Sequence, residues 1–179
     1  LGTQHPSIDA EVISIAVDIY REFNVTDFEL KINSIGCPNC RQQYKDVLKA
    51  ELTKVIDNLS EESKKRVETN PLRVLDSKDE RDKEATKNAP LLLDYLCQEC
   101  KDHFEGVKKY LDELEVKYVV DGRIVRGLDY YTKTAFEIIT RSLGSQDALA
   151  GGGRYDLLTE ELGGNPTFGI GFASGMERL

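Results

Sequence analysis

Hydrophobic and polar positions repeat with two different periods along the chain, and each period predicts a kind of element. Pro6-Ser7 favours the start of a helix, and apolar residues then recur at helical spacing, at Ile8, Val12, Ile15 and Ile19. The stretch 28–32, Phe-Glu-Leu-Lys-Ile, instead alternates apolar and polar residues, as a half-buried strand does. Residues 1–36 therefore predict a helix followed by a strand.

The segment 37–113 has a different character. It carries 15 Lys or Arg and 17 Asp or Glu residues, and its apolar residues fall at helical spacings between the breaks at Pro71 and Pro90. Such mixed and nearly balanced charge is typical of solvated helix surfaces. We predict a small module of three to five helices here.

Strand patterns return after residue 113. Residues 116–120, 134–140 and 167–173 are the expected strands, and residues 157–162 can form a helical turn or two. Strand segments thus lie on both sides of the helical module. The pattern predicts a mixed α/β (α+β) fold, in which a sheet domain with flanking helices (1–36 and 114–179) is interrupted by a helical insertion domain (37–113).

Composition narrows the class of protein. Hydrophobic content of 40% and charged content of 31% describe a soluble globular domain, and no apolar run approaches the ~20 residues that span a bilayer. The net charge of −8 argues against a surface that coats nucleic acid, although it leaves room for a local basic patch. His5 and His103 are isolated in the sequence, so we expect surface positions for both.

Four cysteines form two C-x-x-C pairs, Cys37 with Cys40 and Cys97 with Cys100. Two thiolates at this spacing can bind one tetrahedral zinc ion from a tight turn, and two such turns complete the shell. The gap between the pairs is longer than in compact zinc ribbons. Free reduced thiols and a thioredoxin-like redox pair are the alternatives. A redox motif is expected next to a βαβ unit, and the sequence around these pairs does not indicate one.

Polar and aromatic residues gather between two expected strands, in the stretch 126–137, RGLDYYTKTAFE. The fork of Arg126 suits a carboxylate or phosphate, and Tyr130 and Tyr131 suit a flat polar ring. The triplet 151–153 of glycines lets a backbone approach a ligand closely. These residues indicate a site for an anionic substrate such as a nucleotide phosphate. The alternative is structural: sheet twist for the glycines, packing for the tyrosines and a capped strand for Arg126.

These stretches resemble the motifs of one family. RGLDYYTKTAFE and AGGGRYDLL (150–158) resemble the two histidine-specific motifs of the histidyl-tRNA synthetases. FGIGFASGMERL (168–179) is similar to the third motif of class II synthetases, and INSIGCPNCR (32–41) and NPLRVLDSK (70–78) resemble parts of the family's insertion domain. The resemblance runs essentially from end to end, and it identifies the chain as a piece of a bacterial-type member.

The resemblance implies part of the class II antiparallel sheet and a histidine–tRNA ligase activity. Such an enzyme activates L-histidine with ATP and Mg²⁺ to histidyl-adenylate and transfers the acyl group to tRNA(His). It further implies a homodimer for the full-length enzyme, a cytoplasmic location and no membrane association. The first two class II motifs should precede Leu1 and the anticodon-binding domain should follow Leu179, so we expect little activity from this piece alone.

Site roles follow from the same resemblance. Arg126 matches the catalytic arginine that contacts the histidine carboxylate and the ATP α-phosphate, and Arg178 matches an ATP-binding arginine. The residues that match the histidine pocket are Tyr130, Tyr131, Gly151, Gly152 and Tyr155. The sequence departs from the family at Ala150, often a cysteine, and at Leu157, usually a glycine; neither is an expected ligand.

Two other classes of function compete with this reading. A catalytically dead paralogue would bind histidine to regulate another enzyme, but it has no need of an ATP-binding arginine such as Arg178. A zinc-stabilised RNA-binding module is the second rival. The near balance of charge in 37–113 speaks against strong RNA affinity for that segment by itself.

Overall fold

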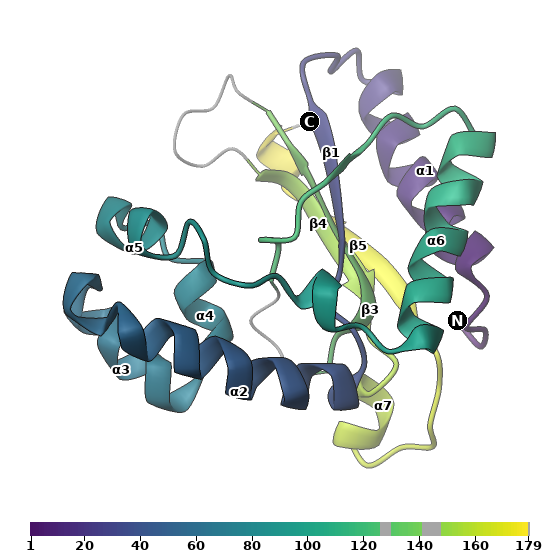
Figure 1. The fold of residues 1–179 in the computed structure, drawn as a ribbon. Coiled ribbons are helices and arrows are strands. Elements are labelled where there is room, and N and C mark those ends of the chain that lie inside the picture. Colours follow the sequence, from purple (N-terminus) through teal and green to yellow (C-terminus); the bar gives the residue numbers. More distant parts are fainter. Residues whose placement is uncertain (126–129, 141–147, 179) are drawn as a thin grey trace.

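The computed structural model describes residues 1–125, 130–140 and 148–178, with only the backbone of Arg178 (Figure 1). The predicted first helix is α1, Pro6–Glu22. Pro6 occupies its first turn, where a missing N–H costs nothing, and the His5 ring accepts a hydrogen bond from the Ser7 N–H. The buried side of α1 is Ala10, Ile13, Ala16, Val17 and Tyr20, whereas Ile15 is 49% exposed.

Five strands form one sheet in the order β2-β1-β3-β4-β5. Their bounds are Glu29–Ser34 (β1), Val119–Val120 (β2), Thr132–Ile139 (β3), Ala148–Arg154 (β4) and Ile170–Ser174 (β5). All neighbouring strands are antiparallel except β1 and β2, which are parallel. The predicted fold class, a mainly antiparallel sheet with flanking helices, is confirmed.

One face of the sheet is covered by two helices that lie side by side, α1 and α6 (Gln98–Glu113) (Figure 1). Their apolar residues form a first core with the sheet, which includes Phe104 and Leu111 of α6 and Phe136 and Ile138 of β3. Helix α6 lies inside the segment predicted as the insertion domain, yet it shares this core with α1. The domain boundaries themselves stay a prediction.

The other helices form a second group, called here the helical group: α2 (Pro38–Lys54), α3 (Glu61–Thr69), α4 (Leu72–Leu75) and α5 (Glu80–Ala85). Short 3-10 helices, Ile56–Asn58 and Leu92–Tyr95, accompany them. Tyr44, Leu48 and Leu52 of α2 centre a second core that also includes Ala135 of β3. Strand β3 is therefore packed on both faces, with α1 and α6 on one and the helical group on the other (Figure 1).

The strand predictions hold in part. The expected strand 116–120 is reduced to Val119–Val120, and the last one begins at Ile170 rather than at residue 167. The glycine triplet lies inside β4, for which the pattern gave no strand. Helix α7 (Leu158–Glu161) and the 3-10 helix Met176–Arg178 complete the described elements. No helix in the described ranges is both long and apolar enough to cross a bilayer.

Candidate functional site

A strip without side chains runs across β4 and β5. Gly153 of β4 pairs with Ala135 of β3 and with Gly171 of β5. Directly paired residues of an antiparallel sheet point to the same face, and successive residues alternate between faces. Because Ala135 belongs to the second core, this is the face opposite α1 and α6. Gly153, which is buried, and Gly171, which is half-buried, are called here the glycine strip, because neither places a side chain on this face.

Two tyrosines border the glycine strip. A Cβ built on Gly153 would lie 3.2 Å from Tyr131 Cδ1, and one built on Gly171 would lie 3.3 Å from Tyr155 Oη. Tyr130 stands against Tyr131, with ring centroids 4.9 Å apart. Burial and the neighbouring Tyr131 raise the pKa of Tyr130, so its hydroxyl stays a hydrogen-bond donor. Tyrosine rings and hydroxyl groups therefore gather beside the glycine strip, and such groups suit the recognition of a flat polar ring.

The structure places most of the sequence-predicted pocket residues around this strip. Tyr131 and Tyr155 border it, Tyr130 adjoins it, and Gly151 lies on the same face as Gly153. Gly152 points to the other face, where a Cβ would lie 2.4 Å from Gly171 O and 2.7 Å from Phe136 Cε1. Packing therefore accounts for the glycine at 152. Roles in histidine binding stay a prediction for all five residues.

Two arginines were predicted for the site, and the structure describes the side chain of neither. Arg126 lies outside the described residues, and so does the side chain of Arg178. Sequence reasoning named the triplet that contains Gly153, but it missed that Gly153 lies beside Gly171 between the tyrosines. Their signal is present, since both are glycines of quoted motifs, but only the strand register brings them together.

Arg154, which the sequence analysis did not single out, directly precedes Tyr155 and holds the end of β4 in place through buried ion pairs. It is fully buried and ion-paired with Asp9 of α1 and with Asp156, whose Oδ1 lies 3.0 Å from Arg154 Nη1. The same Asp156 oxygen accepts a hydrogen bond from the Gly169 N–H at 3.1 Å. Burial opposes the charge of Arg154, but Asp9 and Asp156 outweigh it and raise the pKa. The neighbours of Tyr155 on both sides are thereby fixed.

His103 belongs to the surroundings of this network and corrects an expectation. We expected a surface position, but the residue is 7% exposed on α6, because its face of the helix packs towards α1. Its Nε2 lies 3.5 Å from Asp9 Oδ2, and no hydrogen-bond partner of Nε2 is found among the residues that the structure describes. Burial lowers the pKa of His103, and nearby Asp9 only partly opposes the effect.

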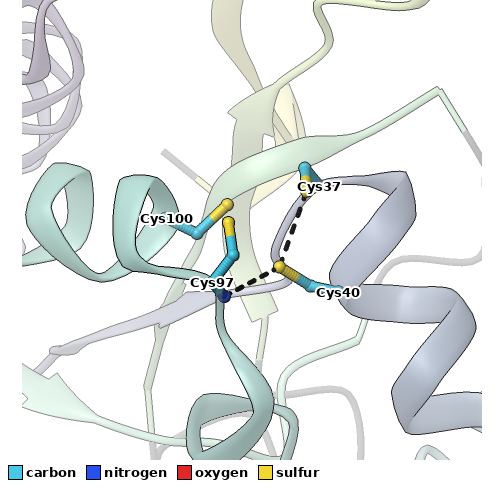
Figure 2. A group of neighbouring side chains, drawn as sticks. All are labelled: Cys37, Cys40, Cys97 and Cys100. Atoms are coloured by element: carbon cyan, nitrogen blue, oxygen red, sulfur yellow. Dashed lines mark hydrogen bonds between the residues drawn. The ribbon is translucent and has the colours of Figure 1, made fainter.

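The four cysteines meet at the N-termini of two helices. Cys37 and Cys97 are the N-cap residues of α2 and α6, and Cys40 and Cys100 lie in the first turns. Figure 2 shows the four thiols converging from the two helices, and all four Sγ atoms lie within 4.8 Å of one another. The Cys37 and Cys40 Sγ atoms are 3.5 Å apart, and the Cys97 N–H donates to Cys40 Sγ at 3.1 Å.

This donor set fits a tetrahedral zinc ion. Zinc–sulfur bonds of about 2.3 Å place the sulfurs of a tetrahedral site about 3.8 Å apart. Burial raises the pKa of Cys40 and Cys100, so their thiolates require a neighbouring cation. Gly36 precedes the first pair with φ +62°, and a Cβ there would lie 2.7 Å from Cys40 Cβ. The structure brings all four cysteines together, as the zinc hypothesis requires.

Comparison with known proteins agrees with these motifs. The sequence profile of the family Histidyl-tRNA synthetase matches residues 1–179. The histidine–tRNA ligase of Caldanaerobacter subterraneus is 54% identical over 178 residues, which are 99% of this chain and 43% of that protein. A Clostridium botulinum histidine–tRNA ligase is 53% identical, with 42% of its length covered. The chain thus spans less than half the length of these curated relatives.

Solved structures extend the comparison to the fold. Apo histidyl-tRNA synthetase from S. aureus superposes with a TM-score of 0.77 at 38% identity, over 99% of this chain and 43% of that one. A Bacillus halodurans protein described as an ATP phosphoribosyltransferase regulatory subunit/histidyl-tRNA synthetase has a TM-score of 0.51 at 22% identity, which shows a shared fold alone. With a family match along its whole length, the chain belongs to the histidyl-tRNA synthetase family.

Proposed function

We propose that the protein carrying this chain is a histidine–tRNA ligase, which activates L-histidine with ATP and transfers it to tRNA(His). One observation carries the proposal beyond family membership. The two segments that resemble the histidine-specific motifs contribute adjacent antiparallel strands, β3 and β4, and tyrosines of both segments border the glycine strip. That geometry suits an imidazole ring, with Tyr131 and Tyr155 as its walls.

In this proposal two arginines stabilise the negative charge of the histidine carboxylate and of the ATP phosphates. Arg126 would meet the histidine carboxylate and the ATP α-phosphate, where a preorganised cation stabilises the charge that develops as the phosphoryl group transfers. Arg178 would hold the terminal phosphates of ATP, which carries Mg²⁺. A tyrosine hydroxyl of Tyr130 or Tyr131 would fix the imidazole tautomer, with the backbone at Gly151 and Gly152 beside it. A homodimer and a cytoplasmic location complete the proposal.

The test is pyrophosphate exchange into ATP, measured on a protein of the relatives' full length. We expect exchange that depends on L-histidine, and an Arg126→Met variant that loses on the order of 100-fold or more in rate. Binding of tRNA(His) by this variant should stay near that of the parent. Histidine binding without exchange would favour the regulatory paralogue, and tRNA binding that falls as much as exchange would remove Arg126 from the catalytic role.

A structural zinc ion held by Cys37, Cys40, Cys97 and Cys100 is also part of the proposal. Its support is the convergence of the four Sγ atoms from two helix N-termini. We expect one zinc per chain by elemental analysis, and cobalt substitution should give the absorption bands of a tetrahedral thiolate site. A Cys40→Ser variant should lose the metal. Metal content near zero in protein purified without chelator would favour free thiols or a redox pair.

A further inference from the structure

The turn that holds the first cysteine pair also contacts the tyrosine segment. Arg41 follows Cys40 directly, and its Nη1 donates a hydrogen bond of 2.7 Å to the backbone oxygen of Tyr131. A guanidinium bonded to a carbonyl oxygen limits rotation of that peptide group. The position of Tyr131 therefore depends on where the first turn of α2 lies.

The second cysteine pair reaches the same segment from the other side. Glu99 lies between Cys97 and Cys100, and its Oε1 accepts a 2.7 Å ion-paired hydrogen bond from Lys133 Nζ. The Lys133 side chain is only 7% exposed. A nearly buried ammonium group needs an acceptor, so Glu99 is part of what holds Lys133 in place.

Backbone bonds complete the connection. The Lys133 N–H donates to Gly36 O at 2.8 Å, and the Ile35 N–H donates to Lys133 O at 2.7 Å. Lys133 has φ +51°, which is uncommon for a residue with a side chain, and the β3–β4 register shifts between Thr132 and Ala135. A strained bulge of this kind persists where its surroundings hold it. Here the surroundings are the two cysteine turns.

We propose that Arg41 and Glu99 are positioning residues, through which the four-cysteine site sets the conformation of residues 130–133 and hence the affinity for histidine. The inference rests on the proposed function in assigning Tyr131 to the histidine pocket. In this proposal neither residue touches the substrate. Arg41 acts through the Tyr131 peptide, and Glu99 acts through Lys133, two residues further along β3.

Steady-state exchange kinetics on the full-length protein test this inference. We expect Arg41→Met to raise KM for histidine roughly tenfold and to change KM for ATP by less than about twofold. The reason is that the lost hydrogen bond positions Tyr131, which is assigned to the histidine pocket and not to the ATP site. Arg41→Lys, which keeps one donor, should restore part of the affinity. Lys49→Met is the matched control, because Lys49 lies on α2 but pairs with exposed Glu68. Equal effects on both substrates, or on the control, would overturn the inference.

The second arm uses Glu99 and the cysteines. Glu99→Ala should raise KM for histidine selectively, whereas Glu105→Ala on the same helix, which removes the pair with Lys108, should not. Cys97→Ser, at the exposed cysteine, should have the same selective effect as Glu99→Ala. A Cys97→Ser enzyme with unchanged KM for histidine would separate the cysteine site from the pocket and refute the coupling.

Hydrogen exchange supplies a readout that needs no activity. In Arg41→Met and Glu99→Ala, the amides of residues 130–136 should exchange on the order of tenfold faster, while those of α1 stay unchanged. If the parent protein lacks histidine-dependent exchange of pyrophosphate, the proposed function fails, yet this measurement still decides the coupling. Amide exchange at 130–136 that is unchanged in both variants would refute it.

Discussion

Asp9 and Arg154 are 145 residues apart in the sequence and form an ion pair in which both side chains are fully buried. The pair joins the first turn of α1 to the end of β4, one residue before Tyr155. Thr134 of β3 donates a further hydrogen bond to the same carboxylate. The network thereby ties a helix and two strands to one another behind the glycine strip.

Breaking this pair should destabilise the fold. Asp9→Asn leaves the buried guanidinium with Asp156 as its remaining carboxylate, and loss of one partner of a buried pair typically costs about 3 to 5 kcal/mol. Urea unfolding at pH 7 measures the change. Asp18→Asn is the control, since its pair with Arg21 is half exposed and such pairs contribute about 0 to 1 kcal/mol. A loss in Asp9→Asn no larger than in this control would contradict the prediction.

His103 should make stability depend on pH near neutrality. Its folded-state pKa is lowered from 6.5 by burial, so the unfolded chain binds the proton more readily. Stability is therefore full above about pH 6.5 and falls as the pH drops through that value. His103→Gln should flatten the pH dependence between pH 7.5 and 5, as measured by urea unfolding. An NMR titration midpoint of His103 above 6.5 would show that the sign is wrong.

Asp82 should make the helical group sensitive to acid. Its buried carboxylate accepts hydrogen bonds from the Ser60 N–H and from the hydroxyls of Ser60, Ser63 and Ser77. Burial alone would raise the pKa, but these donors lower it from 3.8 to about 2. A shift of this size corresponds to about 2 kcal/mol, present above about pH 4 and lost as the pH falls towards 2.

The corresponding variant is Asp82→Asn. It should lose about 2 kcal/mol at pH 7, and the difference from the parent should shrink below pH 4. Circular dichroism during urea titration at several pH values follows both quantities. Asp57→Asn, at an exposed position outside this network, serves as the control. If the difference in unfolding free energy between the parent and Asp82→Asn does not change with pH, the effect of the substitution comes from altered packing and not from the lost charge.

Two glycines of neighbouring strands should respond differently to alanine. Gly152→Ala places a methyl group 2.4 Å from Gly171 O, a backbone atom, so we expect a loss of about 1 to 3 kcal/mol in stability. Gly171→Ala adds its methyl group to the face of the sheet that carries Tyr155, 3.3 Å from Tyr155 Oη. It should cost less than about 1 kcal/mol but weaken histidine binding roughly tenfold.

Thermal unfolding and calorimetric titration of L-histidine into the full-length protein separate the two effects. Should Gly171→Ala bind histidine as the parent does, the glycine strip is not the floor of the pocket. Should Gly152→Ala be as stable as the parent, the close packing at that position is not a constraint on the sequence.

Local sequence patterns predicted the helices and strands better than they predicted how these elements pack against one another. The helical spacing after Pro6 correctly predicted α1, but the quoted apolar residues do not define its buried side, which includes the small residues Ala10 and Ala16. The strand β4 was missed because glycines carry no period-two signal and disfavour strands in general. Only the tertiary fold decides which face a bare strand presents.

The site divides in the same way. The two-residue spacing within each cysteine pair encodes the geometry of that pair locally, whereas the meeting of the two pairs, which the zinc hypothesis requires, is set by the tertiary fold. The partnership of Asp9 with Arg154 has no local signal, because charge alone does not specify which of many residues will be its partner. The alignment of Gly153 with Gly171 depends on strand register, which is set by packing on both faces of the sheet.

The position of β3 between two cores has a consequence for the order of folding. Ser34 of β1 pairs with Thr134 of β3, and closing a loop of roughly 100 residues delays such pairing. The helices between them leave the ribosome before β3 does. Once the helical group forms and the two cysteine turns meet, the loop that remains to be closed is short. We expect these helices to act as a folding template, so that variants of the cysteine turns slow refolding of the sheet more than they change its final stability.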